Sequence, residues 1–324
     1  MSSSISRRDF VAQSGSCAAH LALAAMAMPL AARLAWAQSP TGRVVAREPF
    51  GSLEKISDGV WALVSTPLTG DSTTVSNGGI IAGRSGVLAI EGFNKPQGAQ
   101  WMATKAKELT GKWPTHVVLT HYHADHANGV AGYQDGVEHP VVHTTDRTRE
   151  LVMTKNMPAD AARATALTGA ELLSRDTATT LDLGGRTVRV IPRGGHTDSD
   201  VTLEMDDPNI VFCGDLVWNG MFPNYVDCVP SKLKTSVHAI RRSTPETIYV
   251  PGHGTIARVA DFDRYAAMID EVERGARAAY AAGTPAADAG ASFQLPPSLG
   301  EWVMFSKTFY PRAFEAWYRE LKGA

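Results

Sequence analysis

Three histidines and one aspartate fall within six residues near the middle of the chain, where residues 120–126 read Thr-His-Tyr-His-Ala-Asp-His. In an extended chain, side chains two residues apart point to the same side of the backbone, so His121 and His123 can converge on one metal ion. The alternation ends where the chain turns into a helix, which lets Asp125 and His126 face a second metal ion. Imidazoles and carboxylates are common zinc ligands, so the pattern predicts a metal site. A solvated histidine-rich loop is the alternative.

Three further segments place a histidine or an aspartate where a predicted strand runs into a glycine-containing loop. They are Gly-Gly-His-Thr around His196, Cys-Gly-Asp ending at Asp215, and Pro-Gly-His-Gly around His253. Taken alone, each such residue is more often part of a turn than a ligand. A two-sheet sandwich, however, brings the loops at its strand ends together on one rim. We therefore expect seven metal ligands, namely His121, His123, His196, Asp125, His126, Asp215 and His253.

Strand and helix patterns alternate through the part of the chain that carries these residues. Apolar strand-type runs bounded by turn residues occur at 60–65, 74–82, 87–90, 115–120 and 141–143, and again at 178–183, 187–191, 201–205, 210–213 and 247–250. Helical patterns occur at 95–109, 127–133, 231–242 and 258–282, and residues 144–175 form a mostly helical excursion. Two strand-rich halves, each followed by helix, predict an α/β fold with sheets packed between helices.

The C-terminal part has a different composition. Residues 283–299 are rich in glycine, proline and alanine, which predicts a linker or loop. Aromatic residues then recur at near-helical spacing: Trp302, Phe305, Phe309, Phe314, Trp317 and Tyr318. Core packing of a terminal helix is the favoured interpretation, and an aromatic wall facing a substrate is the alternative.

Composition limits the class of protein. The chain has 324 residues, 31 lysines and arginines against 33 acidic residues, and 44% apolar residues, which is ordinary for a globular protein with a full core. The near-neutral charge gives no basic surface for nucleic acid. No run of about 20 apolar residues is free of charges and helix breakers, which excludes a multi-spanning membrane protein.

The N-terminus carries the features of an export signal. Residues 6–11 read Ser-Arg-Arg-Asp-Phe-Val, an apolar stretch follows at 17–32, and Ala-Trp-Ala at 35–37 provides a cleavage site. The pattern predicts a twin-arginine signal peptide over 1–37, the twin-arginine export machinery as a partner, a periplasmic location, and no stable membrane insertion after cleavage. An alanine-rich N-terminal helix is the alternative. In an oxidising periplasm Cys213 and Cys228 could pair, and the sequence leaves that open.

From about residue 53 to residue 282 the sequence resembles the metallo-β-lactamase superfamily, with a His-x-His-x-Asp-His motif and three downstream partners in the family's order. The resemblance implies a four-layer αβ/βα sandwich that binds two metal ions, usually zinc. It assigns His121, His123 and His196 to the first ion, Asp125, His126 and His253 to the second, and Asp215 to a bridge between them. We expect three parts: the signal (1–37), the superfamily domain (38–284), and a C-terminal linker with an aromatic helix packed on the domain (285–324).

The ligand set also indicates a branch of the superfamily. In the commonest true β-lactamase subclass a cysteine takes the position of Asp215, whereas here Cys213 lies two residues earlier. A bridging aspartate is typical of glyoxalase II-like thioesterases, lactonases and the SoxH or quinoprotein-relay group, and the signal and aromatic tail resemble the last of these. Glu91 departs from the family pattern, which usually has aspartate at this position, and its supporting role is therefore an open question.

Two Zn²⁺ ions at such a site would lower the pKa of a bound water from 15.7 to about 7 and supply a hydroxide for attack on a carbonyl carbon. Asp125 would accept a hydrogen bond from that hydroxide and orient it, as the catalytic residue. The expected activity is hydrolysis of a small-molecule ester, thioester, lactone or β-lactam.

Other functions remain as alternatives at this stage. They are a mononuclear iron persulfide dioxygenase-like oxidoreductase, a periplasmic β-lactamase, and a non-catalytic periplasmic metal or redox-partner protein. The substrate-binding residues are unknown. Aromatic and lysine side chains after the Asp215 strand could line the site or belong to the core and the solvated surface: Trp218, Phe222, Tyr225, Lys232 and Lys234.

Overall fold

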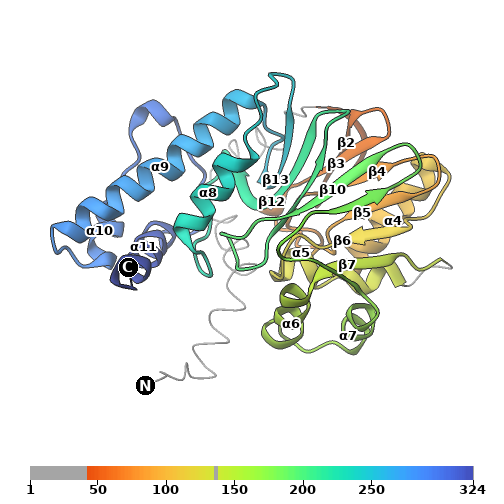
Figure 1. Cartoon of the computed structure of the whole chain (residues 1–324), viewed down its shortest axis with the longest axis horizontal. Helices are drawn as coiled ribbons and strands as arrows, with labels where there is room; N and C mark the ends of the chain where they lie inside the picture. Colours follow the sequence, from red (N-terminus) through yellow and green to blue (C-terminus); the bar gives the residue numbers. More distant parts are fainter. Residues whose placement is uncertain (1–41, 135–137, 324) are drawn as a thin grey trace.

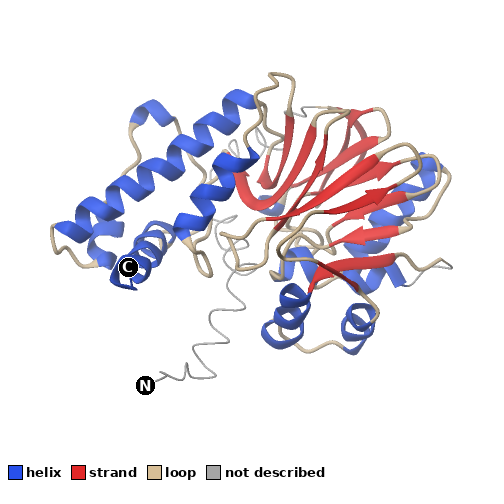
Figure 2. Ribbon diagram, in the orientation of Figure 1, coloured by secondary structure: helices blue, strands red, loops and turns tan. Residues whose placement is uncertain are grey.

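The computed structural model describes residues 42–134 and 138–323, and the predicted export signal at 1–37 lies outside them. Two β-sheets pack face to face, and helices cover both outer faces (Figures 1 and 2). One sheet has eight strands in the order β1 to β8, and the other has five in the order β13-β12-β11-β10-β9. This four-layer α/β arrangement, with helices at the C-terminal end, confirms the predicted fold class.

The eight-stranded sheet changes character halfway across. Strands β1 to β5 are joined as antiparallel neighbours, whereas β5 to β8 are parallel. Parallel neighbours need crossover connections, which are usually helical. The strands are β1 (Arg43–Glu48), β2 (Gly51–Ser57), β3 (Val60–Ser65), β4 (Gly78–Ala82), β5 (Val87–Ile90), β6 (His116–Val118), β7 (Val141–Thr145) and β8 (Glu171–Leu173). The crossovers contain α4 (Pro96–Thr110), α5 (Ala124–Ala127), η2 (Val130–Gln134), α6 (Asp146–Lys155) and α7 (Ala161–Thr168).

The five-stranded sheet is antiparallel except at β12 and β13, which run parallel because α8 (Pro230–Ile240) connects them. Its strands are β9 (Thr179–Asp182), β10 (Thr187–Pro192), β11 (Val201–Met205), β12 (Ile210–Asn219) and β13 (Ile248–Gly254). The 23-residue helix α9 (Val259–Ala281) follows β13 and lies with α8 on the outer face of this sheet (Figure 1).

Alternating side chains divide each central strand between two cores. In β3, Val60, Ala62 and Val64 belong to the core between the sheets, whereas Trp61 and Leu63 face the layer that contains α4. In β12, Ile210 and Phe212 join the inner core, whereas Val211 and Cys213 face α8 and α9. Strand side chains alternate in direction, so strands buried on both faces are apolar throughout. This explains why the sequence shows these strands as continuous apolar runs.

The structure differs from the sequence-based expectation at both ends of the domain. Strands β1 and β2 were not predicted. Residues 283–299, expected to be a linker, contain the helix α10 (Ala286–Ser292) and the short turn η3 (Pro297–Leu299). Gly290 allows α10 to pack closely, because a Cβ atom there would lie 2.4 Å from the Cα atom of Pro311. Helix packing therefore overrides the glycine and proline content of this segment.

The terminal helix α11 (Phe309–Gly323) packs against α8 and α9 (Figure 1). Phe309, Phe314, Trp317 and Tyr318 are buried in the same core as Phe262 of α9. The aromatic residues of this helix thus pack in a core, as the favoured interpretation had it.

Cys213 and Cys228 are both buried, and in the described part of the chain neither forms a disulfide. Among residues 42–134 and 138–323, none of the helices combines the length and apolar character needed to span a bilayer.

Candidate metal centre

Four of the predicted ligands converge at one end of the sandwich. His121 and His123 follow β6, His196 lies in the loop after β10, and Asp215 lies in β12. His123 Nδ1 lies 3.1 Å from His121 Nε2 and 2.9 Å from His196 Nε2. Asp215 Oδ2 is 3.2 Å from His196 Nε2 and 3.8 Å from His121 Nε2. These four donor atoms enclose a single position.

The other three ligands form a second group beside the first. Asp125 and His126 come from α5, and His253 comes from β13. Asp125 Oδ2 lies 3.2 Å from His253 Nε2 and 3.7 Å from His126 Nε2. Asp215 contributes its second oxygen here, because Oδ1 lies 3.0 Å from His126 Nε2 and 3.4 Å from His253 Nε2. One carboxylate therefore takes part in both groups.

Glycine makes the close approach of β12 and β13 possible at this point. A Cβ atom at Gly252 would lie 1.9 Å from Asp215 Oδ1, a distance that no side chain tolerates. Gly214, which precedes Asp215, has φ of +52°, a conformation that glycine adopts without strain. The glycines beside the ligands are thus needed for the approach of the two strands and for the turn into Asp215.

The donor sets fit tetrahedral metal ions. With zinc–ligand distances near 2.05 Å, the edges of such a tetrahedron are about 3.3 Å long. The measured edges run from 2.9 to 3.8 Å in the first group and from 3.0 to 3.7 Å in the second. His126 Nε2 and Asp215 Oδ1 are buried 3.0 Å apart, yet in the described part of the chain neither atom makes a hydrogen bond of ordinary geometry. Buried polar atoms of this kind need a partner, and a cation would supply one.

The electrostatics of this cluster of ligands also favour bound cations. Burial opposes ionisation of Asp215, yet the imidazoles of His253, His126 and His196 hold the pKa of its carboxyl well below the usual range. Burial would lower the pKa of His253, but Asp215 and Asp125 raise it to about 9. The carboxylates therefore attract positive charge into a buried site, and bound cations would replace these protons.

Glu91 supports a ligand in each group. Its carboxylate accepts hydrogen bonds from the Thr120 hydroxyl at 2.6 Å and the Thr120 amide at 3.2 Å, and it lies 3.0 Å from His126 Nδ1. Because the Thr120 hydroxyl gives its one proton to Glu91, it accepts from His121 Nδ1, 3.0 Å away. The Nε2 lone pair of His121 is then free to face the metal position. Glu91 therefore has a supporting role although it stands where the family usually has aspartate, because it orients His121 through Thr120 and lies against His126.

Glu91 also has an uncommon backbone conformation. Its φ of +77° lies in the left-handed region, which costs a residue with a side chain about 1 kcal/mol or more. The contacts to Thr120 and His126, together with the hydrogen bond from the Gly92 amide to the His126 carbonyl at 2.7 Å, hold this conformation in place. Strain of this kind persists only where the surroundings determine it, as they do at this carboxylate.

Asp227, in the loop before α8, is a supporting residue that sequence reasoning missed. Its Oδ2 lies 3.1 Å from His123 Nε2 and accepts a short hydrogen bond from the Tyr122 hydroxyl, and Lys155 Nζ lies 3.4 Å from Oδ1. Burial opposes ionisation of Asp227, but His123, Tyr122 and Lys155 keep the pKa of its carboxyl below the usual range. With Nε2 bound to Asp227, His123 presents Nδ1 to the metal position, whereas the other four histidines present Nε2.

The residues considered for substrate binding separate into different roles. The ring of Trp218 lies 4.1 Å from that of His253, centroid to centroid, and also contacts Phe305. Phe222 and Tyr225 are buried in the core with α8, α9 and α11. Lys234 forms ion pairs with Asp270 and Glu273 on α9. Of this set, Trp218 is the residue that contacts a candidate ligand.

We expect Glu91→Gln to weaken zinc binding about 10- to 100-fold, the range found when a group that supports the metal ligands is replaced. The amide of glutamine keeps one acceptor oxygen but carries no negative charge. It therefore cannot both accept the hydrogen bonds from Thr120 and offset a positive charge on His126. A competition titration with a chelating dye measures the change. Glu108→Gln, an exposed residue of α4 paired with Lys105, is the matched control. Unchanged affinity in Glu91→Gln would mean that the carboxylate does not orient the ligands.

The family model that matches this chain is that of the metallo-beta-lactamase superfamily, over residues 92–253. A curated relative, the hydroxyacylglutathione hydrolase of Acidiphilium cryptum, is 32% identical over 179 residues. The aligned stretch covers 55% of this chain and 66% of that relative, just under two thirds of its length. The matched region contains six of the seven candidate ligands in its interior and ends at the seventh, His253.

Solved structures share the fold at low sequence identity. The metallo-beta-lactamase from Erythrobacter litoralis, with beta-mercaptoethanol in its active site, has a TM-score of 0.57 at 18% identity, covering 70% of this chain and 99% of that one. The metallo-beta-lactamase from Pontibacter korlensis has a TM-score of 0.55 at 21% identity, covering 67% and 98%. At these sequence identities the comparison shows a shared fold.

Proposed function

We infer that this chain, which belongs to the metallo-beta-lactamase superfamily, is a hydrolase that uses two zinc ions to cleave a small-molecule carbonyl substrate. One observation carries the proposal: two tetrahedral sets of donor atoms share the two oxygens of Asp215. A structural zinc site closes around one ion with four protein ligands. Two adjacent positions, joined by a carboxylate, are typical of metal-assisted hydrolysis.

A thioester is the substrate class that we propose first. The curated relative is named as a hydrolase of an acyl-glutathione, and its aligned stretch covers 55% of this chain. The aspartate at position 215 supports the same choice, because the Cys213 thiol points to the Val211 carbonyl and is not among the donor atoms. Esters and lactones contain the same reacting carbonyl group and remain within the proposal.

The chain's own residues have distinct tasks in this reaction. Bound zinc ions supply Lewis acidity, which polarises a carbonyl oxygen and makes water nucleophilic at neutral pH. Asp125 has the position of an acceptor that orients the attacking water and takes its proton. Asp215 fixes the spacing of the two metal positions. Trp218 packs on the ring of His253 and holds its orientation.

Two features favour the hydrolase over the alternatives. The second donor group, Asp125, His126 and His253, supplies a further metal position that a mononuclear iron oxygenase does not need. The carboxylate of Asp215, where the commonest β-lactamase subclass has a thiolate, argues against a cysteine-ligated β-lactamase. We also propose that the protein is exported by the twin-arginine route, is periplasmic and belongs to the SoxH-like group. The signal-like pattern of residues 1–37 supports this part of the proposal.

Metal analysis of the purified protein, followed by assays on a thioester, a lactone and a chromogenic cephalosporin, tests the function. We expect two zinc ions per chain, thioester hydrolysis, at least a 100-fold loss of activity after chelation, and recovery on adding zinc. One iron per chain would support the oxygenase instead. Two zinc ions without turnover of any of these substrates would contradict the hydrolase.

A further inference from the structure

A helical excursion lies directly against the metal-ligating segment. It consists of α6, α7 and the turn between them, residues 146–168, and it is inserted between the parallel strands β7 and β8. Figure 1 shows α6 and α7 below α5 and β7. The excursion contributes no residue to either donor group. It nevertheless contacts the metal-ligating segment, residues 121–128, near both of its ends.

The first end is Tyr122, between the ligands His121 and His123. The side-chain amide of Asn156, buried after α6, donates a hydrogen bond of 2.7 Å to the Tyr122 carbonyl. The ammonium of the preceding Lys155 lies 3.3 Å from the Tyr122 hydroxyl and 5.1 Å from the centre of its ring. Backbone and side chain at this position are therefore both held by the excursion.

The second end is Asn128, which follows α5 and its ligands. Arg163 of α7 is 4% exposed, and its guanidinium donates 2.9 Å hydrogen bonds to the Asn128 side-chain oxygen and the Asn156 carbonyl. A third bond, of 2.8 Å, goes to the Pro158 carbonyl. One buried side chain thus connects the end of α5 to the residue that holds Tyr122.

The chemistry of Arg163 is unusual for a residue that serves stability alone. Among the residues that the structure describes, its guanidinium has three oxygen acceptors and none of them is a carboxylate. A buried cation that makes no hydrogen bond to a carboxylate is costly to desolvate, and burial lowers the pKa of this guanidinium by more than the charge of Asp160 raises it. The fixed, forked donors of the guanidinium provide geometry, because they join α7 to the end of α5 and to the turn between α6 and α7 in one arrangement.

We propose that Asn156 and Arg163 are positioning residues that hold the two ends of the metal-ligating segment and so set the affinity for metal. The inference rests on the proposed metal site. Ligands held in place before binding lose little freedom when the ion arrives, so affinity is high. When either contact is removed, the metal-free segment becomes more variable and binding must order it.

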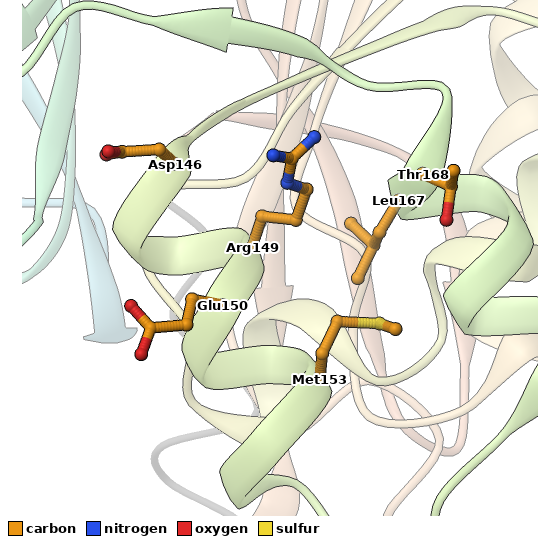
Figure 3. Close-up of a pocket in the computed structure, with 6 residues that line it drawn as sticks. All are labelled: Asp146, Arg149, Glu150, Met153, Leu167 and Thr168. Atoms are coloured by element: carbon orange, nitrogen blue, oxygen red, sulfur yellow. The ribbon is translucent and has the colours of Figure 1, made fainter.

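Asn156→Ala and Arg163→Met test the proposal, with Arg149→Met as the matched control. Arg149 lies on the same excursion and lines a surface groove of about 380 Å³ between α6 and α7, as Figure 3 shows. In the described structure it makes no polar contact with residues 121–128. We expect the two test variants to raise the zinc dissociation constant about 10-fold, the lower end of the range for groups that support ligands. The control should keep the wild-type value.

A second readout separates positioning from general stability. Melting temperatures are measured for each variant with and without zinc. A positioning role predicts that the gain in melting temperature on adding zinc is smaller than in the wild type, and that Co²⁺ added in place of zinc gives an altered visible spectrum. The proposal would be overturned if a variant lowered the melting temperature equally with and without zinc and left the zinc dissociation constant unchanged. If Arg163→Met does not fold, the milder Asn156→Ala decides by the same two measurements.

The test also distinguishes this inference from the proposed function. Wild-type protein that binds no zinc or cobalt would overturn both proposals. Wild-type protein that binds two ions, with test variants that match it, would overturn only the role of the excursion. Weaker binding in the test variants supports that role whether or not a thioester is the substrate, because neither readout depends on turnover.

Discussion

Asp125→Asn is expected to abolish measurable turnover, a loss of about 1000-fold or more in kcat/KM. The substitution keeps the size of the side chain and one oxygen 3.2 Å from His253 Nε2, so a metal ion can remain bound. It removes the negative charge and the ability to accept a proton, and general base catalysis of this kind contributes about 100- to 10,000-fold. The measurement is kcat/KM for the substrate found in the assays, with metal content determined on the same sample.

Asp198→Asn is the control for this experiment, because Asp198 lies only two residues after His196 but its carboxylate pairs with Arg147 at the surface. Its rate should match that of the wild type. Wild-type rates in Asp125→Asn at full metal occupancy would remove Asp125 from the mechanism and leave it, at most, a ligand.

Asp215→Asn is expected to reduce the zinc content from two ions to one or fewer, and the rate by at least 100-fold. The two oxygens of Asp215 lie in different donor groups, 3.2 Å from His196 Nε2 and 3.0 Å from His126 Nε2. An amide has one acceptor oxygen, and its NH₂ group would face one of the two metal positions. It also lacks the charge that partly neutralises two cations in a buried site.

Zinc content measured after dialysis checks this expectation. Asp206→Asn is the matched control, because Asp206 lies exposed on the turn after β11, where its carboxylate pairs with Arg189. A variant at Asp215 that retained both zinc ions at wild-type affinity would show that this carboxylate does not join the two positions.

The sequence predicted the fold and the candidate ligands for related physical reasons. Runs such as 60–64 are apolar at every position because both faces of the strand are buried. His196, Asp215 and His253 stood out because a polar residue followed an apolar strand and had glycine beside it. At Gly252 the structure gives the reason for that glycine, since a side chain there would collide with Asp215.

What the sequence could not predict depends on contacts between distant parts of the chain. Asp227 and Asn156 have no local pattern, and they reach His123 and Tyr122 only after the sheets and the excursion are assembled. The strands β1 and β2 carry charged residues at adjacent positions, Arg47-Glu48 and Glu54-Lys55, so charges fall on both faces and the alternation of apolar and polar residues is weak. Trp218 belongs to an apolar strand end, and only the packing of β12 beside β13 places its ring on His253.

Each donor group takes ligands from both halves of the sandwich. His121 and His123 extend from the eight-stranded sheet, whereas His196 and Asp215 extend from the five-stranded one, and His126 and His253 are divided in the same way. An ion at either position would therefore act as a reversible cross-link between the two sheets at their open rim. By mass action, the free energy that holds the halves together then grows with the concentration of free metal.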